Sequence, residues 1–307
     1  MLRRLLPCLL LLCAWPTVAG ALEPVRVAEG VYAFIGDLGE AAAGNGGNIG
    51  NSGFIVGRTG VIVIDTGISY RHGQAMLEAI HRVSDKPVQL VIVTHAVQEF
   101  VFGNAAFAEL GTPMLTHAKS AELMRQRCDH CLANLRKILG EHTMAGTRLI
   151  VPERTVDRST TLAVAGRKLE LLYFGWASTP GDLAVLDHDS GVLFAGGLVT
   201  SGRIPEVRDS DIDGWLQALE QLARVPAHAV VPGHGPTGGA EIIRATAAYL
   251  RALDREVQEL YGNGTSLMEA VDAAILPAYS DWSLYPSLHR QNALHRYLQL
   301  EVKDLGG

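Results

Sequence analysis

Two histidines and one glutamate are the residues best suited to bind a metal ion. His95 follows an apolar run in "VIVTHAVQEFVFGN", Glu99 lies four positions further on, and His234 lies in "VVPGHGP". Imidazole and carboxylate groups coordinate zinc and iron, and two histidines with one carboxylate can hold a single ion. These three side chains are the candidate metal ligands. The alternative is that both histidines hydrogen-bond to loop backbone and that Glu99 caps the following helix.

Cys128 and Cys131 form a C-x-x-C pair within "LMRQRCDHCLANL". Such a pair can be a thiol redox centre, half of a zinc site or a disulfide. The sequence contains no second C-x-x-C pair to complete a zinc site, and this pair falls in the middle of a predicted helix instead of at its N-terminus. Residues three apart on a helix are neighbours on one face. We therefore expect a structural disulfide between Cys128 and Cys131, with a thiol redox centre as the alternative.

Buried strands are expected to lead into each candidate ligand. A hairpin is predicted around residues 57–60, and its second strand, "VIVID", ends at Asp65. Ser69 is the expected N-cap of a helix that runs to about Val83, and the next strand, "DKPVQLVIVTH", ends at His95. A later strand, "AHAVVPGHG", contains His234.

The order of the remaining elements predicts an α/β protein. One strand is expected over residues 25–35, a loop over 36–53 and around Pro152, helices over 104–110, 118–139 and 213–223, and strands over 161–165, 168–174, 183–187 and 192–195. The C-terminal part is predicted to be helical, with a capping box at Ser266 and Glu269. Strands thus fall in two groups, each followed by helices. This order predicts two packed sheets with helices outside, although an open doubly wound sheet has a similar order.

Residues 1–21 have the features of a secretory signal peptide. Arg3 and Arg4 precede a short apolar run, and a small-residue cleavage site ends at Ala21. Lipid attachment at Cys13 is disfavoured because Leu12 occupies the position of a small residue. We expect a periplasmic or secreted protein that is cleaved near Ala21, does not associate with the membrane after signal removal, and forms a single domain over residues 22–307.

The mature chain is acidic. Loss of the two positive charges of the leader changes the formal net charge from −6 to −8. An acidic surface repels phosphate groups, so nucleic acid and anionic membranes are excluded as expected partners.

Four stretches together resemble the metallo-β-lactamase superfamily: "VIDTG", "THAVQEFVFGN", "STPGDLAVL" and "VVPGHGP". Further stretches are similar to the exported quinoprotein relay system zinc metallohydrolases, namely "EGVYAFIG", "GNIGNSGFIVG", "VFGNAAFAE", "GWLQALEQLA" and "LHRQNALHRYLQLE". The resemblance implies a metallo-β-lactamase-type αββα sandwich, in which two mixed β-sheets are flanked by helices. It also implies that metal ligands lie on loops at one edge of the sheets.

The resemblance further implies that most metal-ligand positions are substituted. The superfamily pattern His-x-His-x-Asp-His falls on His95, Val97, Glu99 and Phe100, and a further ligand histidine falls on Ser178. The bridging aspartate falls on Gly197, whereas His234 retains the ligand type. Valine, phenylalanine and glycine side chains cannot coordinate zinc. The expected cofactor is therefore none, or a weakly bound single zinc at His95, Glu99 and His234.

Four other polar residues near these positions are expected to have structural roles. Asp65 resembles the superfamily aspartate that orders the metal loop through backbone hydrogen bonds. Asn104 and Asp182 are expected to be cap and turn residues. Ser178 lacks the G-x-S-x-G context of an activated nucleophile and is expected only to fill a vacated histidine position.

Three functional hypotheses follow. The first is an exported pseudoenzyme of the hydrolase superfamily that has a degenerate zinc site and binds a small molecule or a partner from quinoprotein-dependent oxidation. The second is a mononuclear metal-dependent hydrolase that uses His95, Glu99 and His234. The third is a thiol redox protein that acts through Cys128 and Cys131.

Overall fold

The computed structural model describes residues 22–305. The expected signal peptide, its cleavage site at Ala21 and Cys13 lie outside these residues. Among the described residues, no helix combines the length and apolar character needed to cross a membrane.

The first sheet has seven strands that are hydrogen-bonded in sequence order. Its first four strands are antiparallel neighbours and its last three join in parallel, so the sheet is mixed. The strands are β1 (Val25–Ala28), β2 (Val31–Phe34), β3 (Ser52–Val56), β4 (Val61–Ile64), β5 (Val88–Ile92), β6 (Met114–His117) and β7 (Arg154–Val156).

The second sheet has five strands in the order β12-β11-β10-β9-β8. Only β11 and β12 pair in parallel, and the other neighbours are antiparallel. The strands are β8 (Thr160–Val164), β9 (Arg167–Leu172), β10 (Ala184–Asp187), β11 (Val192–Thr200) and β12 (Ala229–His234). Two mixed sheets are therefore present, as predicted, and not one doubly wound sheet.

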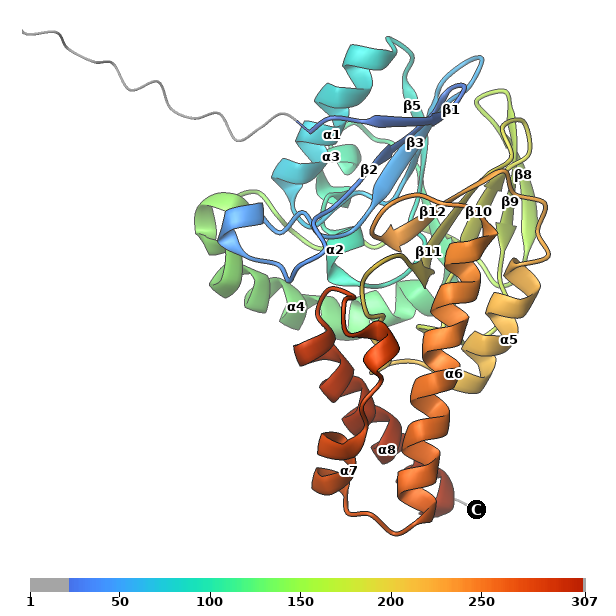
Figure 1. The fold of residues 1–307 in the computed structure, drawn as a ribbon. Helices are drawn as coiled ribbons and strands as arrows, with labels where there is room; N and C mark the ends of the chain where they lie inside the picture. Colours follow the sequence, from blue (N-terminus) through green and yellow to red (C-terminus); the bar gives the residue numbers. More distant parts are fainter. Residues whose placement is uncertain (1–21, 306–307) are drawn as a thin grey trace, which may run out of the picture.

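Helices cover both outer faces of this sandwich (Figure 1). Side chains of α1 (Tyr70–Val83), α3 (Asn104–Ala108) and α4 (Ala118–Met144) pack against the first sheet, beside the single-turn helix α2 (Gln98–Val101). The second sheet packs against α5 (Ile212–Leu222) and α6 (Ala240–Gly262), and α8 (Arg290–Leu305) packs against α6 in the same hydrophobic cluster. The remaining helical segments are η1 (Ala43–Asn45), α7 (Leu267–Ala273), η2 (Pro277–Tyr279) and η3 (Tyr285–His289).

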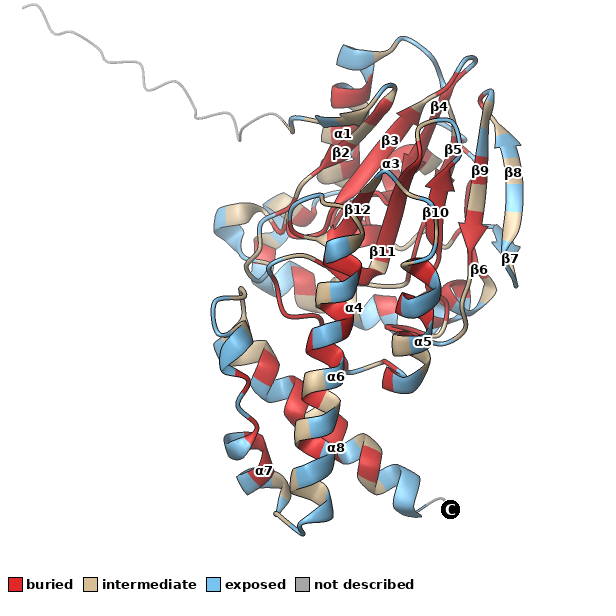
Figure 2. Cartoon of the chain, turned by 45° about the vertical axis from the view of Figure 1, so that its right-hand side comes forward, coloured by how far each residue is buried: buried red, intermediate tan, exposed pale blue. Residues whose placement is uncertain are grey.

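The core between the sheets consists of branched and aromatic side chains from both inner faces. Ile55 and Ile62 of the first sheet share this layer with Val185, Phe194 and Val231 of the second, and all five are buried. Figure 2 shows the central strands of both sheets buried and the edge strands β7 and β8 exposed or intermediate, whereas the longer helices have an exposed face. Burial of these side chains is the main stabilising contribution to the sandwich.

Local signals in the sequence position several elements as expected. The Ser69 hydroxyl accepts a hydrogen bond from the His72 N–H at 3.1 Å, and the helix it caps ends at Val83. The capping box between Ser266 and Glu269 is also present. Both motifs act through neighbours in the chain, so they can be read without tertiary structure.

Two predicted elements were wrong in detail. Residues 25–35 form the hairpin of β1 and β2, because Gly30 adopts a left-handed φ of 71° and turns the chain. A strand, β7, also forms in the segment after Pro152 that was predicted to be a loop. It is an edge strand of only three residues, too short to show alternation in the sequence.

Candidate functional site

His95 follows β5 and is held by a chain of hydrogen bonds that starts at Asp65. The Asp65 carboxylate accepts hydrogen bonds from the Thr94 N–H at 2.8 Å and from the Thr94 hydroxyl at 2.7 Å. Since the hydroxyl donates to Asp65, Thr94 Oγ1 accepts the Nδ1–H of His95, at 2.8 Å. The proton of the neutral imidazole is thereby placed on Nδ1, and Nε2 is the lone-pair nitrogen.

Burial is the main influence on the protonation of Asp65 and His95. It raises the pKa of Asp65 to about 7, although both hydrogen bonds from Thr94 act in the opposite direction. It lowers the pKa of His95 to about 3, despite the favourable charge of Glu99. His95 is therefore a neutral imidazole at physiological pH.

Glu99 and His234 contact each other directly. The Nε2–H of His234 donates to Oε1 of Glu99 at 3.1 Å, and the N-cap residue of α2 is Val97, which makes no side-chain cap. Burial on its own would raise the pKa of Glu99, but the hydrogen bond and charge of His234, together with the charge of Arg203, lower it to about 2. Burial and the positive charge of Arg203 lower the pKa of His234. The Glu99 carboxylate is therefore ionised at neutral pH and accepts the hydrogen bond from His234.

The phenyl ring of Phe100 lies against both histidines. Its centroid is 4.2 Å from that of His95 and 5.4 Å from that of His234, and the residue is fully buried. Within residues 22–305, no three His, Cys, Asp or Glu side chains are grouped closely enough to hold a metal ion. His95, Glu99 and His234 thus share one region but do not converge on a common point.

Gly197 of β11 lies close to His95 and Ser178, and there is no room for a side chain at this position. A Cβ atom at residue 197 would lie 2.7 Å from His95 Cδ2 and 2.8 Å from Ser178 Oγ. These distances are too short for non-bonded contacts, so any larger residue at 197 would require His95 or Ser178 to move.

Asp182 organises the turn that contains Ser178. Its carboxylate accepts hydrogen bonds from the Ser178 hydroxyl at 2.9 Å, the Thr179 N–H at 2.6 Å and the Thr179 hydroxyl at 2.8 Å. Burial raises the pKa of Asp182 to about 6, against the effect of these hydrogen bonds. The Ser178 hydroxyl is engaged with a carboxylate and has no contact of the kind that activates a nucleophile.

Asn104 begins α3 and ties two loops together away from the cavity. Its amide donates to the Ile150 carbonyl at 2.9 Å, and its Oδ1 accepts from the Thr66 hydroxyl at 2.8 Å. This arrangement is that of a structural residue.

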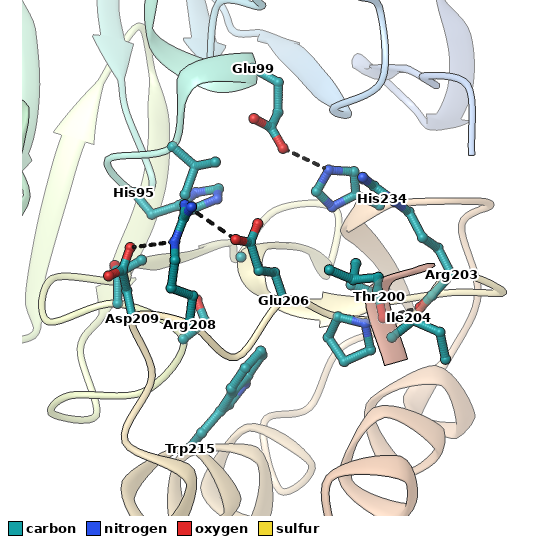
Figure 3. A pocket seen from close by; sticks show the side chains of 16 residues that line it. His95, Glu99, Thr200, Arg203, Ile204, Glu206, Arg208, Asp209, Trp215 and His234 are labelled. Carbon is teal, nitrogen blue, oxygen red and sulfur yellow. Dashed lines mark hydrogen bonds and ion pairs between the residues drawn. The ribbon is translucent and has the colours of Figure 1, made fainter. Parts of the chain in front are cut away.

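A cavity of about 80 Å³ lies where the ends of the two sheets meet (Figure 3). His95, Val97, Glu99, Ser178, Gly197 and His234 line one part of it, so the structure brings together the positions identified from the sequence. The other lining residues were not predicted: Thr179, Thr200, Arg203, Ile204, Pro205, Glu206, Arg208, Asp209, Trp215 and Leu288. The one signal for them in the sequence is the charged, proline-containing stretch "GRIPEVRD", which directly follows β11.

Cys128 and Cys131 lie in the middle of α4, as predicted, but the predicted disulfide was wrong: both are free thiols. Cys128 is buried in the hydrophobic cluster between α4 and the first sheet, while Cys131 is partly exposed. The hydrogen bond from Cys128 and the charge of Arg208 lower the pKa of Cys131 to about 7, although burial opposes them. Cys128 is accommodated as an apolar core residue and does not need a covalent bond to be buried.

Comparison with known proteins gives one family. The model of the metallo-beta-lactamase superfamily matches residues 45–234. The linear primary-alkylsulfatase of a Pseudomonas species is 23% identical over 261 residues, which cover 72% of this chain and 49% of that protein. The metallo-beta-lactamase type 2 of Bacteroides fragilis is 32% identical over 103 residues, which cover 32% of this chain and 41% of that protein. The chain thus spans about half or less of the length of these two relatives.

Solved structures show the same fold. A metallo-beta-lactamase from Pontibacter korlensis aligns with a TM-score of 0.62 at 24% identity, over 75% of this chain and 99% of that chain. A metallo-beta-lactamase from Hirschia baltica aligns with a TM-score of 0.60 at 20% identity, over 75% of this chain and 98% of that chain. At these identities the likeness concerns the fold.

Proposed function

The chain belongs to the metallo-beta-lactamase superfamily, and we propose that it is an exported member whose cavity binds a small molecule in place of a hydrolytic zinc centre. In this proposal the protein is a pseudoenzyme linked to quinoprotein-dependent oxidation. The leader at residues 1–21 supports export, and the stretches similar to the quinoprotein relay system proteins support the link.

The observation that carries the proposal is the position of Phe100. A zinc ion shared by two histidines needs both ring nitrogens about 2.0–2.1 Å from the metal. The phenyl ring instead packs against both imidazoles, with centroids 4.2 and 5.4 Å away. Phe100 cannot coordinate, and its ring takes up space beside the two retained histidines.

The state of the other candidate ligands supports the same conclusion. His234 donates its Nε2–H to Glu99, so this nitrogen has no lone pair to offer a metal. Val97 and Gly197 provide no donor atom, and the Ser178 hydroxyl is bound to Asp182. The side chains present do not fit a hydrolytic zinc centre, and a weakly bound single zinc is the most that they would hold.

The cavity has the composition of a small-molecule site. Apolar groups of Val97, Ile204, Trp215 and Leu288 form part of its lining, and polar and charged side chains form most of the rest. This combination is typical of ligand pockets, in which apolar surface contributes affinity and a few polar groups fix orientation.

Metal content and hydrolysis test the proposal. The mature protein, purified without added metal and dialysed, should contain well under one zinc per chain by elemental analysis and should cleave β-lactams and thioesters no faster than buffer. Stoichiometric zinc or iron that resists chelators and is lost in His95→Ala and His234→Ala would overturn it and point to a mononuclear metal site instead. Protein recovered from the periplasm should begin at about Leu22 by mass spectrometry, whereas a retained Met1 would contradict export.

A thiol redox activity is the second candidate function. It is favoured by one observation: Cys131 is a partly exposed thiol beside a buried thiol, and its pKa is lowered. Accessible thiols with lowered pKa values are more reactive at neutral pH.

A further inference from the structure

Arg203 is a buried guanidinium that lacks hydrogen-bond partners. It is 8% exposed, and its Nε and Nη1 atoms find no acceptor among residues 22–305. Its side chain lies beside His234 in the wall of the cavity (Figure 3). A buried charged group without partners is costly, so such a group indicates a ligand that supplies the missing acceptors.

Hydrogen bonds hold the backbone around Arg203 in place. The Arg203 carbonyl accepts a hydrogen bond from the Thr200 hydroxyl at 2.9 Å. The neighbouring Ile204 N–H donates to the Ser283 carbonyl at 3.1 Å, and the Ser283 N–H donates to Gly202 at 2.9 Å. These bonds fix the position in the cavity wall from which the side chain starts.

The acidic groups nearest to Arg203 have other partners. Glu99 is hydrogen-bonded to His234 at 3.1 Å, and Glu206 forms an ion pair with Arg208 at 3.2 Å. Asp209 is paired with Arg127. Asp37 and Glu40 contribute only longer-range attraction to Arg203. Within the described chain, Nε and Nη1 of Arg203 are therefore free to donate to an acceptor that a ligand supplies.

The remaining lining restricts what that partner can be. Ile204, Pro205, Trp215 and Leu288 place apolar surface in the same cavity. A guanidinium presents five N–H donors in a planar fork that matches a carboxylate. A ligand that satisfies both parts of the wall has one carboxylate and a small apolar body.

We propose that Arg203 binds the carboxylate of a small organic monocarboxylic acid, whose apolar part lies against Ile204, Trp215 and Leu288. This inference rests on the proposed function, since it assumes that the cavity takes a ligand instead of a zinc centre. It adds the chemical class of the ligand and the residue that recognises it.

Binding to matched acids and amides tests the inference. Titration calorimetry on the metal-free mature protein would use butanoate, hexanoate and benzoate, with butanamide and benzamide as neutral counterparts and phosphate as a simple anion. At least one carboxylate should bind, and its amide should bind about 10- to 100-fold more weakly, because hydrogen bonds to charged groups are worth about 1.5–3 kcal/mol.

Variants of Arg203 test whether this residue causes the difference in affinity between acid and amide. Arg203→Gln should lose about the same 10- to 100-fold in carboxylate affinity and leave amide binding unchanged. Arg251→Gln removes an equal charge from an exposed arginine on α6 that pairs with Glu220, and it should bind like the unmodified protein. If Arg203→Gln does not fold by circular dichroism, Arg203→Lys decides, since it keeps the charge and loses the planar fork.

Three outcomes would overturn the inference: no binding of any of the carboxylates, equal binding of acid and amide, or affinity for phosphate equal to that for the carboxylates. Unchanged carboxylate affinity in the Arg203 variant would do the same. Zinc content measured on the same samples separates the two proposals. Stoichiometric zinc removes the proposed function, whereas metal-free protein that fails to discriminate acid from amide removes only the assignment of Arg203.

Discussion

The His234 imidazole donates its Nε2–H to the Glu99 carboxylate at 3.1 Å, although the two residues are 135 positions apart in the chain. This contact joins α2, beside the first sheet, to the end of β12 in the second sheet. Two of the three candidate metal ligands are thus used to connect the halves of the sandwich at the cavity.

The first prediction concerns the acid stability that Glu99 provides. Its pKa in the folded protein is about 2, below the ordinary value of 4.5. A carboxyl group with a lowered pKa stabilises the fold fully above its unfolded pKa, and this contribution is lost as the pH falls towards the folded value. The difference corresponds to about 3 kcal/mol.

Urea denaturation at several pH values measures this effect. The free energy of unfolding of Glu99→Gln should fall less steeply than that of the unmodified protein between about pH 4.5 and pH 2. Glu78→Gln, which changes an exposed residue on α1, is the matched control and should keep the original slope. Parallel curves for Glu99→Gln and the unmodified protein would show that the carboxylate is not held as described.

The second prediction concerns the packing of Phe100. The ring is fully buried against two imidazoles, so Phe100→Ala should lower the free energy of unfolding by about 3–5 kcal/mol, and Phe100→Leu by less. Chemical denaturation of both variants gives these values. A loss below about 1 kcal/mol in Phe100→Ala would mean that the ring is not part of a close-packed wall.

The third prediction concerns the rebuilding of a zinc site. A variant that combines four substitutions should take up zinc if these positions correspond to the superfamily ligands: Val97→His, Glu99→Asp, Phe100→His and Ser178→His. Adding Gly197→Asp should increase zinc affinity but lower stability, because a Cβ at residue 197 would lie 2.7 Å from His95 Cδ2. Elemental analysis and thermal melting test both parts. If the variant with all five substitutions folds but binds no zinc, these positions do not correspond to the superfamily ligands.

The fourth prediction concerns the reactivity of the two thiols. The hydrogen bond from Cys128 is the largest cause of the lowered pKa of Cys131, about 7 against an ordinary 9.0. Alkylation of Cys131 by iodoacetamide should therefore rise with a midpoint near that pH, and Cys128→Ala, which removes the donor, should move the midpoint upward. Peptide mass spectrometry at each pH follows both residues. Equal rates for Cys128 and Cys131, or no reaction before denaturation, would exclude a selective thiol.

Most of the fold could be predicted because apolar runs and helix caps depend on residues that are close together in the sequence. The runs of β-branched residues that end at Asp65 and before His95, the cap at Ser69 and the box at Ser266 act over a few residues. The substituted ligand positions Val97 and Phe100 were equally visible, since a motif position depends only on residue type and spacing. The hairpin at Gly30 was missed because apolar residues alternate with the same phase on both sides of the short Glu29-Gly30 turn.

Only the tertiary structure decided how these residues are used. The sequence contains Glu99 and His234 as two possible ligands, but the chain path brings them into contact with each other and places the ring of Phe100 beside His95. Arg203 has the residue type of a surface arginine, yet the loop after β11 buries it in the cavity wall without an acceptor on Nε or Nη1 among the described residues. Burial and hydrogen-bond partners depend on segments far apart in the chain, so no local pattern can specify them.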